Sequence, residues 1–156
     1  MGGDGVDNAS SIRMEREFEA PVERVYRAWC APADLEQWAW GSIGQDVAAT
    51  VDLRPGGGFR ISTARPDGTE WAFSGSYIEV VPNRRLVHTL EWEAPMGYEA
   101  EEQVTVEFND QGGKTAVMFI HDGVPDDRSR EGHIEGWGDT FDMLGRLLEG
   151  GPGGEV

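Results

Sequence analysis

The chain has a single cysteine, Cys30, among its 156 residues. One cysteine excludes a disulfide within the chain and a zinc site built from thiolates. The three histidines are scattered without His-x-His, His-x-x-x-His or His-Glu-x-x-His spacing, so the sequence predicts no metal ion and no other cofactor. A Gly-x-Ser-x-Gly motif is also missing, which argues against a serine nucleophile of the hydrolase type.

Basic residues are scarce, with 13 Lys and Arg against 29 Asp and Glu, and the net charge is −16. That charge repels phosphate backbones and anionic lipids, so neither nucleic acid nor a membrane surface is an expected partner. Long apolar runs are lacking too, so no transmembrane helix is predicted. The first residues have neither a basic nor an apolar segment of the secretory type, and a cytoplasmic location is expected.

The length suits a single domain that buries its own core. Residues 1–11 and 150–156 are rich in glycine and small polar residues, and they are predicted to be a disordered leader and a disordered tail. The folded domain is therefore expected over residues 12–149.

Alternation of apolar and polar residues predicts strands over most of this domain. Turn sequences such as Pro-Asp-Gly at 66–68 and Asp-Gln-Gly-Gly at 110–113 separate them and indicate antiparallel neighbours. The expected strands are 12–19, 47–53, 58–65, 70–81, 85–93, 103–109 and 114–121.

Helical spacing occurs in two places. After the first strand, apolar residues recur at helical spacing from Val22 to Trp29. The helix that they predict starts at Pro21 and is interrupted by Pro32. A second short helix is expected at 33–38. A long helix is predicted at about 126–149, with Asp126 or Asp127 as N-cap. The order predicts an α+β fold in which a curved antiparallel sheet of six to seven strands wraps on the C-terminal helix.

A long helix on the concave face of a curved sheet can leave a space between the two layers. Glycines 132, 136, 138 and 145 lie in this helix and fit either close packing on the sheet or room for a ligand. Pockets for small molecules are concave and mostly apolar, with few polar groups. The candidate ligand-binding residues on the inward faces are Phe59, Ile61, Trp71, Phe73, Tyr77, His88, Leu90, Trp92, Val106, Val117, Phe119, Trp137, Phe141 and Leu144.

Several segments resemble one known family. The run Val-Asp-Leu-Arg-Pro-Gly-Gly at 51–57, followed by Phe59-Arg60, is similar to the turn sequence of the heat-shock-protein-90 ATPase activator homologues. Residues 18–29, 35–38, 75–87 and 132–148 resemble the family's opening helix, its central hairpin and its closing helix. These proteins form a branch of the SRPBCC or START-like superfamily, and the resemblance implies the helix-grip fold over residues 12–149.

The resemblance implies a cavity that binds a small hydrophobic or aromatic molecule, without an assigned catalytic residue. A polyketide cyclase or dehydratase-like enzyme is the alternative, because other branches of the superfamily have these activities. A chaperone-associated regulator of the stress response is the second alternative. The eukaryotic chaperone activators carry an additional N-terminal domain, and residues 1–11 are far too short to supply it.

Candidate acid–base groups for the enzyme alternative are His88, Tyr77 and Glu79. His88 shares the parity of Leu86 and Leu90, so its side chain is either a polar anchor in the cavity or a histidine satisfied by a neighbouring strand.

The other histidines and the paired acids have simpler interpretations. His121 is expected to position the turn that follows its strand, and His133 to be solvated. Glu101 and Glu102 are interpreted as solvated surface, as paired acids are common in so acidic a chain.

The pattern of the last strand predicts a second kind of partner, another copy of this chain. Ala116, Met118 and Ile120 should lie on the face opposite Val117 and Phe119. An exposed apolar patch on that face favours a homodimer, unless a loop or the short helices cover it.

Overall fold

The computed structural model describes residues 11–93, 102–124 and 127–149. Nearly all of the expected leader and the whole tail, the acidic stretch 94–101 and the candidate N-cap Asp126 lie outside these residues.

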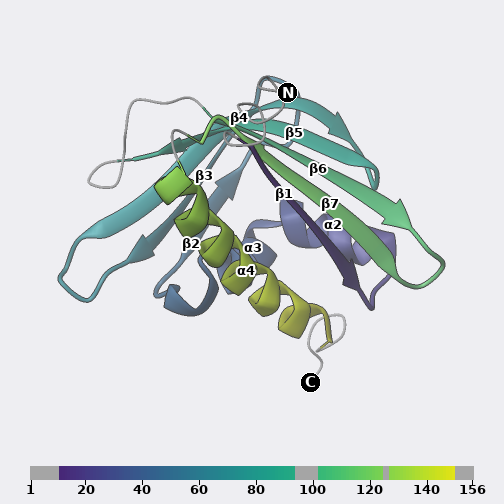
Figure 1. Ribbon diagram of the computed structural model, residues 1–156, viewed down its shortest axis with the longest axis horizontal. Helices are drawn as coiled ribbons and strands as arrows, with labels where there is room; N and C mark the ends of the chain where they lie inside the picture. Colours follow the sequence, from purple (N-terminus) through teal and green to yellow (C-terminus); the bar gives the residue numbers. More distant parts are fainter. Residues whose placement is uncertain (1–10, 94–101, 125–126, 150–156) are drawn as a thin grey trace.

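A seven-stranded antiparallel sheet forms most of the fold (Figure 1), in the order β1-β7-β6-β5-β4-β3-β2. Apart from β1, neighbours in the sheet are neighbours in sequence, as tight turns between alternating segments predict. The strands are β1 Ser11–Phe18, β2 Ala48–Val51, β3 Gly58–Ala64, β4 Glu70–Val81, β5 Arg85–Trp92, β6 Glu102–Asp110 and β7 Thr115–Asp122.

Two short helices, α2 (Val22–Cys30) and α3 (Pro32–Trp38), follow β1, and a short 3-10 helix, η1 (Gly41–Ile43), comes next. Pro32 opens α3 at its first turn, where a proline forfeits no helical hydrogen bond. The long helix α4 (Asp127–Glu149) closes the described chain. The α+β helix-grip fold expected from the sequence is therefore confirmed.

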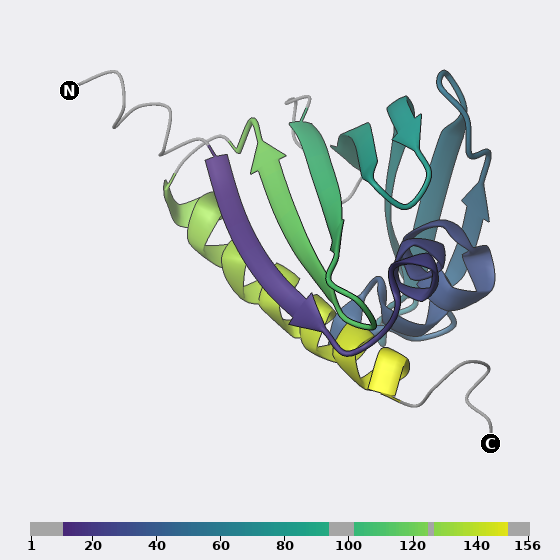
Figure 2. The same ribbon diagram turned by 90° about the vertical axis from the view of Figure 1, so that its right-hand side faces the viewer.

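The helices lie on one side of the curved sheet (Figure 1), and α4 runs alongside β1 (Figure 2). Their apolar faces share one core with the inner face of the sheet. On α4 the apolar residues Phe141, Leu144 and Leu148 are buried, whereas Ile134 and Trp137 are only half-buried, so the N-terminal half of the helix is less tightly covered.

The outer face of β7 carries the three apolar residues expected there. Ala116, Met118 and Ile120 are half-buried, and their partners across the ladder to β1 are Glu17, Glu15 and Arg13. They form a narrow row beside charged side chains. Among the described residues, no helix is long and apolar enough to cross a bilayer.

Candidate functional site: a cavity beside the long helix

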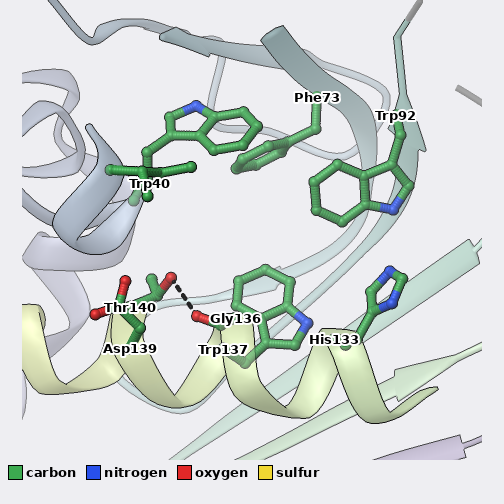
Figure 3. A pocket seen from close by; sticks show the side chains of 11 residues that line it. Trp40, Phe73, Trp92, His133, Gly136, Trp137, Asp139 and Thr140 are labelled. Carbon is green, nitrogen blue, oxygen red and sulfur yellow. Dashed lines mark hydrogen bonds between the residues drawn. The ribbon is translucent and has the colours of Figure 1, made fainter. Parts of the chain in front are cut away.

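A cavity of about 450 Å³ lies between the N-terminal half of α4 and the β4–β5 region of the sheet (Figure 3). In Figure 3, Trp40, Phe73 and Trp92 stand above the space, and α4 lies below it. Its lining residues are Ala39, Trp40, Ile43, Phe73, Trp92, Gly132, His133, Gly136, Trp137, Asp139 and Thr140.

Two glycines keep the α4 side of this cavity open. A Cβ atom added at Gly132 or Gly136 would meet nothing within 4 Å, and both residues line the cavity. Gly138 would meet Arg16 at 3.9 Å and Gly145 would meet Phe18 at 4.0 Å, so these two lie against protein instead. Packing against the protein therefore describes Gly138 and Gly145, whereas Gly132 and Gly136 border open space.

A second hollow lies deeper, against the inner face of the sheet, and holds only about 40 Å³. This volume suits about one water molecule. Phe59, Ile61, Tyr77, His88, Leu90 and Phe119 line it, together with Phe73 and Trp137. Most of the space between the curved sheet and α4 is therefore filled by the protein's own side chains, and open space remains at one end.

The candidate residues fall into three groups. Phe73, Trp92 and Trp137 line the open cavity, and the six residues just named line the deep hollow. Trp71, Val106, Val117, Phe141 and Leu144 line neither. Val106, Val117, Phe141 and Leu144 are buried in the packed core, and Trp71 lies under the guanidinium of Arg65, 4.2 Å from its ring centroid.

Sequence reasoning missed several lining residues. Trp40 and Ile43 come from the segment between α3 and β2, which shows neither helical nor strand periodicity. Asp139 holds this segment to α4, because its Oδ2 accepts hydrogen bonds from the backbone N–H of Ser42 at 2.8 Å and from its hydroxyl at 3.0 Å. The one feature of the sequence that could have indicated these lining residues is a tryptophan, Trp40, in a segment without periodicity.

A buried polar cluster lies at the His133 end of the cavity. His121 Nε2 contacts Glu102 Oε1, and Trp92 Nε1–H donates to the same oxygen at 3.2 Å. Trp137 Nε1–H donates to His121 Nδ1 at 3.0 Å. His133 Nε2 lies 4.0 Å from Glu102 Oε1. Three strands and α4 therefore meet at one carboxylate.

Three expectations about this cluster were wrong. Glu102 is buried instead of solvated, because its side chain lies on the same inward face as Val104 of β6. His121 is fully buried under Trp137, so it does more than position a turn. His133 is half-buried against Trp92 instead of solvated, because it shares the inward face of α4 with Trp137.

The partners of His121 define its protonation. An indole N–H only donates, so Nδ1 of His121 accepts from Trp137 and carries no proton. The neutral ring then has its proton on Nε2 and donates it to Glu102. Glu102 is consequently a buried carboxylate that accepts from both His121 and Trp92.

The acid–base candidates of the enzyme alternative do not gather around the open cavity. Burial lowers the pKa of His88 to about 4, opposed by its bond from Nδ1 to the carbonyl of Thr89 at 2.8 Å. Burial also raises the pKa of Tyr77. The ladder shifts register between Tyr77 and Glu79, and Glu79 pairs with Arg85 at 3.0 Å. Burial raises the pKa of Cys30 to about 12, so its thiol is not an activated nucleophile.

Similarity to known proteins agrees with this architecture. The curved antiparallel sheet with a long C-terminal helix is the helix-grip fold of SRPBCC-type proteins. Residues 19–149 match the family described as activator of Hsp90 ATPase homolog 1-like protein, and the chain belongs to that family. No curated protein matches the chain.

Several solved structures are similar over nearly the whole chain. Protein CV1439 from Chromobacterium violaceum is 27% identical, with a TM-score of 0.79 over 90% of this chain and 97% of its own. A putative uncharacterized protein from Rhizobium leguminosarum is 28% identical, with a TM-score of 0.71 over 89% and 93%. CalU16 from Micromonospora echinospora, at 24% identity, has a TM-score of 0.65 over 88% and 75%, which shows the fold alone.

Proposed function

We propose that the protein binds a small hydrophobic or aromatic molecule in the cavity beside α4. The cavity itself carries this proposal, because its volume of about 450 Å³ falls within the range of ligand pockets. Its wall is mainly aromatic, with Trp40, Phe73, Trp92 and Trp137 around the space. Apolar rings favour an apolar ligand, because binding removes the apolar surface of the ligand and that of the cavity wall from water.

The polar groups of the wall are few and lie at the two ends. His133 lies at one end beside the Glu102 cluster, and Asp139 lies at the other beside η1. A ligand with an apolar body and a polar group at an end fits this distribution. Such a molecule binds without chemical change, and the family of SRPBCC-type folds, known for ligand binding, supports this proposal.

A cavity-filling pair of variants tests the proposal. Gly136→Leu places a side chain in the open cavity, and Gly138→Leu places the same side chain on a part of α4 that does not line it. The neutral fluorescent probe N-phenyl-1-naphthylamine is titrated into each protein, with tryptophan fluorescence as a second signal. We expect the Gly138 variant to bind like the wild type and the Gly136 variant to lose binding. Equal binding by all three proteins would contradict the proposal.

Native mass spectrometry of freshly purified protein complements the titration. It detects a co-purified molecule and gives the subunit count in the same spectrum. A dimer would support the homodimer expected from the outer face of β7, and a monomer would contradict it. Either subunit count leaves the ligand proposal unchanged.

A further inference from the structure

The cluster of Glu102, His121 and His133 has the composition of a metal site. The three residues come from β6, β7 and α4, and one ligand atom of each lies within 4.8 Å of the others. The side chains of Glu102 and His121 are 0% exposed, and that of His133 is 15% exposed. We propose that these three side chains bind a divalent transition-metal ion of the zinc type at the end of the cavity.

The charge of the cluster favours a cation. Glu102 is ionised, because the neutral His121 ring donates to it through Nε2. A carboxylate removed from water is costly unless it is paired or coordinates a metal. The net charge of −16 raises the local concentration of cations further.

The donor atoms select the kind of ion. Two imidazole nitrogens and one carboxylate oxygen suit Zn²⁺ and its neighbours, whereas Mg²⁺ and Ca²⁺ prefer oxygen ligands alone. Bonds of about 2.0–2.2 Å place tetrahedral ligand atoms roughly 3.4 Å apart. The 4.0 Å between His133 Nε2 and Glu102 Oε1 therefore needs to shorten by about 0.6 Å, and the tighter contact of His121 with Glu102 has to open.

The surrounding indoles respond to the ion in different ways. The hydrogen bond from Trp92 to Glu102 still orients the carboxylate when the other oxygen or lone pair binds metal. At His121, metal on Nε2 transfers the ring proton through solvent to Nδ1, which then no longer accepts from Trp137. The Trp137 indole has to turn away, so ion binding alters a wall of the cavity.

Three protein ligands leave at least one coordination position, as in zinc sites that hold a water or a substrate. His133, Trp92 and Trp137 all line the cavity, so this position is reachable from it. The fourth position would bind an oxygen atom of a molecule held in the cavity.

Titration of the purified full chain with Zn²⁺ alone, followed by calorimetry and tryptophan fluorescence, tests the proposal. Chelator-treated protein receives Zn²⁺, Co²⁺ or Mg²⁺ in separate experiments. We expect one Zn²⁺ per chain, quenching or a shift of tryptophan emission, a visible absorption band with Co²⁺, and no comparable binding of Mg²⁺.

Variants locate the ion. His133→Ala changes a half-buried side chain on a helix surface and should weaken Zn²⁺ binding by at least about tenfold. His88→Gln, at the histidine outside the cluster, is the matched control and should bind Zn²⁺ like the wild type. Glu102→Gln keeps the shape of the third ligand and should weaken binding as well, with circular dichroism confirming its fold.

Two results would overturn the proposal. The first is absence of Zn²⁺ binding to the wild type, which would leave the cluster as a hydrogen-bonded network. The second is binding that His133→Ala does not weaken, which would place the ion on surface carboxylates. The measurements contain no organic ligand, so their failure leaves the cavity proposal untouched.

Discussion

Trp137 and His121 are joined by a hydrogen bond of 3.0 Å from the indole N–H to Nδ1, and this bond defines the proton on an entirely buried histidine. A second histidine, the half-buried His88, has the opposite arrangement, because its Nδ1 contacts the carbonyl oxygen of Thr89 at 2.8 Å. A carbonyl only accepts, so Nδ1 of His88 carries the proton. The two histidines are therefore opposite tautomers.

This difference is directly measurable. We expect the long-range ¹H–¹⁵N spectrum to show His121 as the Nε2–H tautomer and His88 as the Nδ1–H tautomer at neutral pH. Trp137→Phe removes the donor to Nδ1 of His121, while Nε2–H still donates to Glu102, so the Nδ1 signal of His121 should shift and the signals of His88 should stay unchanged. The same tautomer for both rings in the wild type would contradict the assignment.

The second prediction concerns pH. Burial lowers the pKa of His88 from its ordinary value of 6.5 to about 4, although its hydrogen bond to the Thr89 carbonyl acts in the opposite direction. Between these two values the unfolded chain binds a proton that the folded chain does not, so the free energy of unfolding rises with pH through this window. The lost stability amounts to about 3 kcal/mol as pH falls from about 6.5 to about 4.

Urea unfolding of the wild type and His88→Gln at a series of pH values measures this contribution. The variant cannot take up the proton, so the difference between the two free energies of unfolding should change across the window and be flat above it. A constant difference from pH 4 to pH 7 would mean that His88 keeps its ordinary pKa in the folded protein.

The sheet was predictable because its sequence pattern is local. Alternation along each strand and turns such as Pro-Asp-Gly at 66–68 define which residues face inward. Most strand ends differ from the expected ones by one or two residues; for example, β2 covers Ala48–Val51 instead of 47–53, and β7 covers Thr115–Asp122 instead of 114–121. Pairing in the sheet then follows from the order of the hairpins.

The site was only partly predictable because it depends on contacts between distant segments. Glu102 and His121 meet through the register of β6 and β7, in which Val104 pairs with His121. His133 joins them because α4 crosses this end of the sheet, and no spacing in the sequence encodes that crossing. Alternation along the strands placed Phe73 and Trp92 correctly on the inner face of the sheet. It does not indicate which part of that face the helices leave uncovered.

Two glycines should respond to alanine with opposite signs. At Gly75 a Cβ would lie 2.0 Å from the carbonyl oxygen of Thr89 and 2.8 Å from the ring of Phe59, so Gly75→Ala should lower the free energy of unfolding by about 2 kcal/mol or more. At Gly136 a Cβ meets nothing, so Gly136→Ala should raise it by about 0.5–1 kcal/mol through helix propensity. Chemical denaturation measures both. A Gly75 variant as stable as the wild type would show that β4 and β5 separate there without cost.

The last prediction concerns the attachment of η1 to α4. Asp139→Ala removes the acceptor for the backbone N–H and hydroxyl of Ser42, which hold η1 beside the cavity. We expect a loss of about 1 kcal/mol in the free energy of unfolding, since the bonds are solvent-exposed, and faster amide exchange at Ser42. Asp142→Ala, three residues along α4, breaks only the exposed pair with Arg16 and should cost less than about 0.5 kcal/mol. Because Ile43 of η1 lines the cavity, the Asp139 variant should also bind N-phenyl-1-naphthylamine more weakly than the Asp142 variant. Equal amide exchange at Ser42 in the two variants would mean that Asp139 does not hold η1 in place.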